Sequence, residues 1–144
     1  MHFKKSVLKN HLLYSIITLM AIAMLFPITA FAQAYVQTWD LVDSGKHLDY
    51  DGNSTYMSYI NTGAATWNAY KSGVIRKDSA FVVEDVYVSD VNASNVATHE
   101  LGHALGLDHS TSTDVMDAAI TGHTSTQALS QNDKDSYDAA YNNY

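Results

Sequence analysis

The sequence predicts an α+β fold, in which a small sheet is combined with three helices. Residues 35–50 and 74–91 are rich in Tyr, Val and Ile, residue types that are favoured in strands. Three further segments, which begin near residues 54, 94 and 130, carry apolar residues at helical spacing. Strands and helices in this order on a short chain are typical of one α+β domain.

The first 32 residues are expected to be a targeting segment rather than part of this domain. Three lysines precede a long apolar run, and Ala30-Phe31-Ala32 has the small residues of a signal-peptide cleavage site. The apolar run approaches the length that spans a bilayer, so a membrane anchor that is not cleaved is the alternative. We therefore expect a signal peptide at 1–32, a single catalytic domain at 33–144 and a secreted protein.

The charge of residues 33–144 narrows the choice of partners. This part of the chain contains all fifteen acidic side chains but only five basic ones, a net charge of −10. Binding to phosphate groups requires a cationic patch, so we expect no nucleic-acid partner and, after cleavage of the leader, no membrane partner. The chain has no cysteine, which excludes disulfides, thiolate metal ligands and a cysteine nucleophile.

The first half of the domain is expected to hold two strands and a helix. Two strands within residues 35–50 flank the turn-forming Asp43-Ser44-Gly45, which predicts a hairpin. Ser54 is a suitable cap for a helix that carries apolar and aromatic residues on one side and ends near Gly73. A short strand is expected at Val74-Ile75, directly after this helix.

The second half is expected to hold a strand and two more helices. The β-branched run within 81–91 predicts the strand. The next helix begins near Ser94 and continues to Gly106, and a Ser/Thr-rich loop follows it. Ser130 with Asp133 three residues later forms a capping-box pattern, which predicts the start of the last helix.

Residues 99–109 read HELGHALGLDH and match the pattern H-E-x-x-H-x-x-G-x-x-H at every specified position. On a helix, side chains four residues apart lie on the same face, so His99 and His103 are able to bind one ion. Glu100 lies about 100° around the helix axis, outside the first coordination shell but within reach of a water on the metal.

The third histidine requires a change of chain direction. His109 is six residues beyond His103, a spacing that points its side chain away if the helix continues. Gly106 is suited to end the helix, because glycine readily adopts the left-handed conformation that redirects the following residues. The turn then returns His109 to the ion. Three imidazoles leave one position of a tetrahedral zinc open, which is the catalytic arrangement.

The chemistry that follows is hydrolysis with one catalytic zinc and Glu100 as the general base that activates the attacking water. Two other functions remain open at this point. One is a module that binds zinc without turnover, although the intact Glu100 disfavours it. The other is a zinc amidase that acts on cell-wall material. The main hypothesis is an endopeptidase that acts on polypeptide as a monomer.

The stretch His99–Ser110, HELGHALGLDHS, resembles the zinc-binding stretch of the metzincin metalloproteases, most closely the matrixin-like branch. Met116 is placed like the methionine of the Met-turn in this group. Residues 64–67 and 129–133 resemble the branch more loosely. The resemblance implies a zinc endopeptidase in which His99, His103 and His109 hold the metal and in which Gly106 and Met116 support the site.

The same resemblance implies a twisted, mixed β-sheet with a backing helix, an active-site helix and a C-terminal helix. It suggests that an extended substrate pairs with an edge strand within Phe81 to Val88; other substrate contacts are unknown. The chain departs from the branch in lacking a propeptide between Ala32 and Tyr35, and Asp117-Ala118 replaces the usual Tyr-Pro.

Calcium is possible but has little support in the sequence. The loop that carries a second zinc and calcium in matrixins is absent. Asp49 to Asn53 has the composition of a calcium loop, yet Ile60 stands where the glutamate ligand is expected, so we interpret the segment as a turn.

Overall fold

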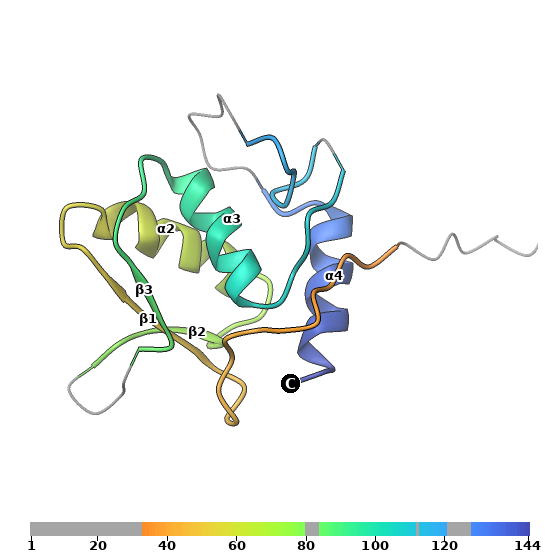
Figure 1. Cartoon of the computed structure of the whole chain (residues 1–144), viewed down its shortest axis with the longest axis horizontal. Coiled ribbons are helices and arrows are strands. Elements are labelled where there is room, and N and C mark those ends of the chain that lie inside the picture. The colour runs from red at the N-terminus through yellow and green to blue at the C-terminus, as the bar shows by residue number, and fades with distance from the viewer. Residues whose placement is uncertain (1–32, 80–83, 112, 121–127) are drawn as a thin grey trace, which may run out of the picture. The chain divides into compact units, whose positions relative to one another are not determined.

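A three-stranded sheet and three helices make up the described part of the chain (Figure 1). The computed structural model describes residues 33–79, 84–111, 113–120 and 128–144, so the expected leader lies outside the described residues. No helix within these ranges is both long and apolar enough to cross a membrane. The expected α+β class is confirmed.

The sheet is parallel. Its central strand, β1 (Leu48–Gly52), pairs on one side with β2 (Ile75–Lys77) and on the other with β3 (Val86–Val88). The expected sheet was mixed, and the difference arises because residues 35–47 do not form a strand beside β1. A helix between β1 and β2 provides the long crossover that adjacent parallel strands require.

The expected hairpin within residues 35–50 is wrong, although its turn is present. The backbone N–H of Asp43 donates to the carbonyl of His47 across a tight turn, at 2.7 Å. The residues before the turn bond elsewhere: Val36 forms an antiparallel bridge with Leu107, far along the chain. Strand propensity indicated extended backbone here, but it does not specify a partner.

The first helix, α2 (Met57–Asn68), is shorter than predicted, and Ser54 does not cap it. Its cap position is Tyr56, which makes no side-chain capping bond. Asn53 instead shapes the entry, because its carbonyl accepts from the N–H of Tyr56 and its side chain accepts from the N–H of Thr55. The helix buries Ile60, Gly63, Ala64 and Trp67.

The second helix, α3 (Ser94–Ala104), packs closely on α2; it begins at the predicted residue and ends two residues before the predicted Gly106. A Cβ atom at Gly63 would lie 2.8 Å from the backbone nitrogen of Thr98 and 2.9 Å from the carbonyl carbon of Ala97. The indole N–H of Trp67 donates to the carbonyl of Thr98 at 2.7 Å. Helix α2 therefore fixes the position of the helix that carries the H-E-x-x-H motif.

The last helix, α4 (Gln131–Tyr141), begins with the predicted capping box. The Ser130 side chain accepts from the N–H of Asp133, and the Asp133 side chain accepts from the N–H of Ser130. Tyr137 is fully buried and meets Trp67 edge to face, with ring centroids 5.4 Å apart. The ion pair of Lys71 with Asp138, at 2.7 Å, joins α4 to the segment after α2.

Replacement of Gly63 by alanine tests the packing of α2 on α3. Helix propensity alone predicts that Gly63→Ala stabilises the protein by about 1 kcal/mol. The Cβ atom would clash with the backbone of α3, and overpacking of this kind costs about 1–3 kcal/mol, so we expect a net loss of stability. Urea unfolding measures the change.

The matched control is Ala65→Gly, at an exposed position of the same helix. It should cost about 1 kcal/mol through helix propensity alone. If Gly63→Ala gains stability by the amount that the control loses, the close approach of the two helices does not constrain residue 63.

Candidate metal centre

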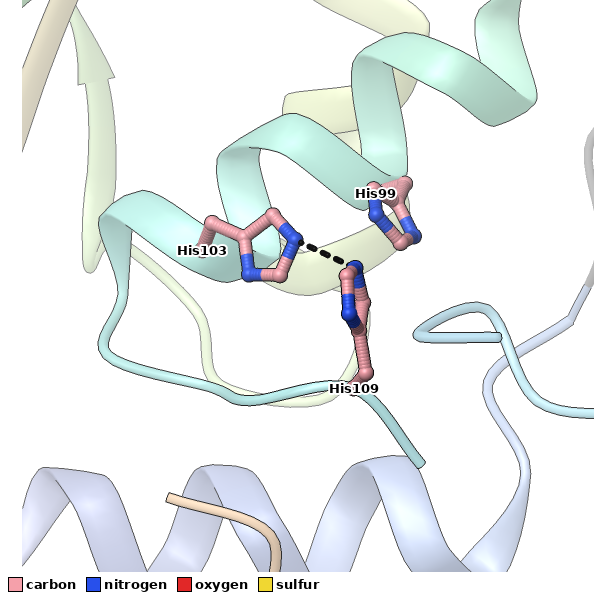
Figure 2. A group of neighbouring side chains, drawn as sticks. All are labelled: His99, His103 and His109. Atoms are coloured by element: carbon pink, nitrogen blue, oxygen red, sulfur yellow. Dashed lines mark hydrogen bonds between the residues drawn. The ribbon is translucent and has the colours of Figure 1, made fainter. Parts of the chain in front are cut away.

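Three histidine side chains meet beside the C-terminal half of α3 (Figure 2). His99 and His103 lie one turn apart on the helix, and His109 reaches them from the segment that follows it. Each ring offers one nitrogen, and the three nitrogens lie within 4.8 Å of one another. The structure therefore brings together the three residues that the spacing of the motif predicted as ligands.

The spacing of these nitrogens suits zinc. The Nε2 atoms of His103 and His109 are 3.2 Å apart. Zinc binds imidazole nitrogen at about 2.0–2.1 Å with tetrahedral angles, which places two ligand nitrogens about 3.3 Å from each other. The donor set also suits this ion, since three neutral imidazoles without a thiolate are a common zinc site that leaves a fourth position for water or substrate.

Two backbone carbonyls orient the rings. Nδ1 of His99 lies 2.9 Å from the carbonyl oxygen of Val115, and Nδ1 of His103 lies 2.9 Å from that of Leu107. A carbonyl oxygen only accepts, so each Nδ1 must carry the ring hydrogen and each Nε2 keeps its lone pair for a metal. Burial lowers the pKa of His99, which favours the neutral imidazole that a metal requires.

Gly106 redirects the chain between the second and third histidines. Its φ of 84° lies in the left-handed region, and its N–H donates to the carbonyl of His103. The next N–H, of Leu107, donates to Gly102, which closes the end of the helix. This turn places the Leu107 carbonyl against His103 and directs His109 back towards the other rings.

Met116 lies buried beneath α3, against a glycine that the sequence analysis left unassigned. A Cβ atom at Gly102 would collide with the Met116 sulfur and would lie 2.9 Å from the ring of Trp67. Gly102 occupies one of the unspecified positions of H-E-x-x-H, so the motif itself gives no sign of this constraint. A glycine inside a predicted helix was the available signal.

Asp133 organises the loop beneath the histidines, in addition to capping α4. Its side chain is fully buried, and its carboxylate accepts hydrogen bonds from the N–H groups of Val115, Met116 and Ser130 at 2.8–3.2 Å. The N–H of Met116 and the carbonyl of Val115 belong to one peptide unit. The Asp133 carboxylate therefore also fixes the carbonyl that orients His99. The sequence predicted the capping role alone, because the loop contacts span seventeen or eighteen residues.

A second carboxylate closes the same loop. Asp114 accepts from the hydroxyl of Thr111 at 2.8 Å and from the side-chain amide of Asn132 at 3.2 Å. Burial opposes ionisation of Asp114, but the polar groups around it, the Ser130 hydroxyl foremost, outweigh burial and lower its pKa. The charged form of Asp114 thus contributes to the shape of the loop.

Glu100 lies exposed on α3, directly after His99 in the sequence. Its negative charge favours the protonated form of His99, although burial of the ring outweighs this effect. No hydrogen bond joins its carboxylate to another described residue. An accessible carboxylate next to a candidate ligand in the sequence is available to exchange protons with a molecule bound there.

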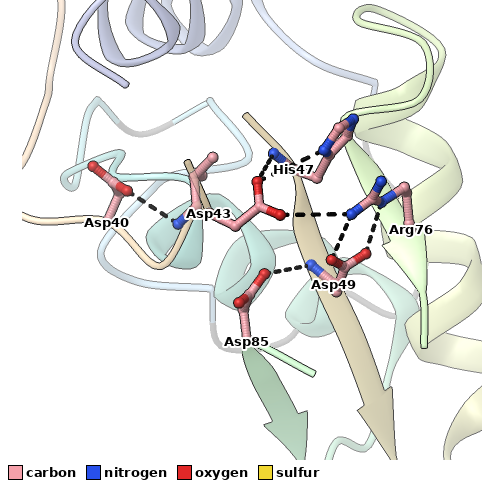
Figure 3. Close-up of polar contacts among 7 residues, drawn as sticks. Asp40, Asp43, His47, Asp49, Arg76 and Asp85 are labelled. Carbon is pink, nitrogen blue, oxygen red and sulfur yellow. Dashed lines mark hydrogen bonds and ion pairs between the residues drawn. The ribbon is translucent and has the colours of Figure 1, made fainter. Parts of the chain in front are cut away.

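A second group of potential ligands, Asp43, Asp49 and Asp85, lies to one side of Arg76 (Figure 3). Arg76 donates two hydrogen bonds to Asp49, at 2.6 and 2.7 Å, and its guanidinium lies 3.6 Å from Asp43. The single positive charge of Arg76 is therefore paired with two of the three carboxylates in this cluster. Asp49 is a residue of β1, so the segment that we interpreted as a turn is instead a strand up to Gly52.

Among known proteins, the chain matches one family model. The family model described as Matrixin matches residues 29–142, which is most of the chain. No curated protein and no solved structure gives a significant match.

Replacement of the buried carboxylate tests whether Asp133 supports the loop. An Asp133→Asn side chain loses one of its two acceptor oxygens, and each buried N–H left without a partner costs about 1–3 kcal/mol. We expect the free energy of unfolding to fall by about 3 kcal/mol in urea titrations.

Asp135→Asn is the control, because Asp135 lies on the same helix and its side chain bonds, among the described residues, only to that of Gln131. It should cost less than about 0.5 kcal/mol. Equal losses in the two variants would mean that the bonds from Asp133 to the loop contribute little.

Proposed function

This chain belongs to the matrixin family, and on that premise we propose that it is a zinc-dependent endopeptidase that hydrolyses extended polypeptides. The observation that carries the proposal is the convergence of three imidazole nitrogens at zinc spacing, with the exposed Glu100 following His99 on the same helix. Membership of a peptidase family supports polypeptide as the substrate. The alternatives without turnover, or with a cell-wall amide as substrate, have no contact in the structure that favours them.

The proposed mechanism assigns separate tasks to the residues of the site. Zinc, when bound, polarises the scissile carbonyl and lowers the pKa of water to near neutrality. His99 and His103 present their Nε2 atoms because the carbonyls of Val115 and Leu107 hold their Nδ1 hydrogens. A carboxylate oxygen of Glu100 accepts the proton of the attacking water and then transfers it to the nitrogen of the leaving amine.

The edge of the sheet supports a proposal for substrate binding. The sequence placed the substrate strand within Phe81 to Val88, a range that contains β3, and among the described strands β3 pairs with β1 alone. Residues 81–83 lie outside the described residues. No described residue pairs with the other edge of β3, which leaves its backbone groups for an extended peptide, a mode that reads backbone more than side chains. Tyr87, on β3, is 56% exposed.

Removal of the proposed base gives the sharpest test of the mechanism. The purified chain should cleave a mixed peptide library, and a chelator should stop the cleavage. Glu100→Ala should bind zinc in the same stoichiometry, measured by atomic absorption, while the hydrolysis rate falls by about 10²–10⁴-fold.

Asp90→Ala provides the control, since Asp90 is another exposed carboxylate near the start of α3 and is not part of the site. It should cleave at the wild-type rate. Wild-type cleavage by Glu100→Ala would rule out this residue as the base, and a wild-type chain that binds zinc but cleaves nothing would point to a module without turnover.

We also propose that residues 1–32 are removed and that the protein is secreted. The lysines, the apolar run and Ala30-Phe31-Ala32 support this proposal. When the full chain is expressed, mass spectrometry of the culture medium should find a product that begins at Gln33. Ala32→Arg should block its release, because the cleavage site requires a small residue. A full-length wild-type chain in the membrane fraction would instead indicate an anchor.

A further inference from the structure

The segment Tyr35–Leu41 is bound along the end of α3, where the metal ligands lie. The N–H of Gln37 donates to the carbonyl of Gly106 at 2.8 Å, and the N–H of Leu41 donates to the carbonyl of Ala104 at 2.9 Å. The carbonyl of Tyr35 accepts from the backbone N–H of Asp108, which follows the Gly106 turn. In Figure 1 this orange segment passes below the end of α3. It therefore holds the turn that links two ligands on the helix to the third.

One side chain of this segment reaches a metal ligand directly. The side-chain amide of Gln37 places its Nε2 atom 3.0 Å from Nδ1 of His103. The carbonyl of Leu107 lies 2.9 Å from the same Nδ1. The other atom of the amide, Oε1 of Gln37, is buried and has no hydrogen-bond partner among the described residues.

The carbonyl of Leu107 requires a hydrogen on Nδ1 of His103, and only one orientation of the Gln37 amide agrees with this requirement. If Nε2 of Gln37 donates, Nδ1 of His103 must be bare, which places the ring hydrogen on the nitrogen that zinc requires. If the amide turns by 180°, Oε1 accepts from the Nδ1 hydrogen together with the Leu107 carbonyl. The second orientation leaves the metal-binding nitrogen of His103 free, and the amide nitrogen then takes the buried position that the oxygen held.

We propose that Gln37 is a positioning residue of the zinc site, which holds His103 in its metal-binding form by accepting a hydrogen bond from Nδ1. The inference rests on the proposed zinc site and adds a residue far from the motif in sequence. Among the described contacts, His99 has a single carbonyl at its Nδ1, whereas His103 has two groups there. Residues 35–41 thus contribute to metal affinity as well as to packing.

A purely structural role for Gln37 makes a different prediction. Gln37 also lines a cavity of about 210 Å³ with Gly106 and Tyr144, and a structural role means that its loss affects packing alone. In that case the stability of the zinc-free protein would fall. The affinity for zinc would then fall only by the amount that this loss of stability explains. A positioning role instead lowers zinc affinity while the zinc-free protein keeps its stability.

The experiment compares three variants of the full chain. Gln37→Met keeps the length of the side chain but removes the acceptor, and Gln37→Glu keeps an acceptor at the same place. Thr38→Ala changes an exposed neighbour in the same segment. The dissociation constant for zinc is measured by competition with a chromophoric chelator, and urea unfolding in excess chelator gives the stability of the zinc-free protein.

Loss of an outer partner of a ligating histidine typically weakens metal binding by about 10–100-fold. We expect this loss for Gln37→Met, with affinity restored to within about threefold in Gln37→Glu and unchanged in Thr38→Ala. Zinc-free stability should stay the same in all three.

Wild-type affinity in Gln37→Met would overturn the inference and leave the proposed function intact. The same follows if Gln37→Glu is as weak as Gln37→Met, or if the weaker binding matches a loss of zinc-free stability. A wild-type chain that binds no zinc would overturn both the inference and the proposed function.

Discussion

Two hydrogen bonds from imidazole nitrogens to backbone carbonyls set the geometry of the candidate metal centre. The carbonyl of Val115 holds His99, and that of Leu107 holds His103. Each bond fixes the ring hydrogen on Nδ1, so both Nε2 atoms face the space that His109 also enters. Since neither carbonyl belongs to α3, the site depends on how the chain outside that helix is held.

The rest of the structure supplies that support from two sides. On one side, the buried carboxylate of Asp133 binds the loop that carries Val115, and Met116 packs into the space left by Gly102. On the other side, the backbone of residues 35–41 binds the Gly106 turn that carries the Leu107 carbonyl. Helix α2 completes the arrangement because it approaches α3 closely enough to fix its position. A small domain without disulfides thus places three ligands by packing and by backbone hydrogen bonds.

Sequence reasoning succeeded where the determinant is local. The spacing of His99 and His103 predicts a shared face because helix periodicity acts over four residues. The cap at Ser130 likewise depends on a neighbour three residues away. It failed where the partner is distant: the segment before β1 has extended character, yet its partner is the end of α3 rather than β1. For the same reason the contact of Gln37 with His103, 66 residues apart, leaves no local signal in one sequence.

Zinc K-edge X-ray absorption of the purified chain tests the central claim most directly, because it reports the number, kind and distance of the ligands. We predict one zinc per chain, bound by three imidazole nitrogens at about 2.0–2.1 Å with the remaining position taken by oxygen. In His109→Ala the number of imidazole ligands should fall. Zinc held by oxygen ligands alone, or an imidazole count that does not change in His109→Ala, would contradict this claim.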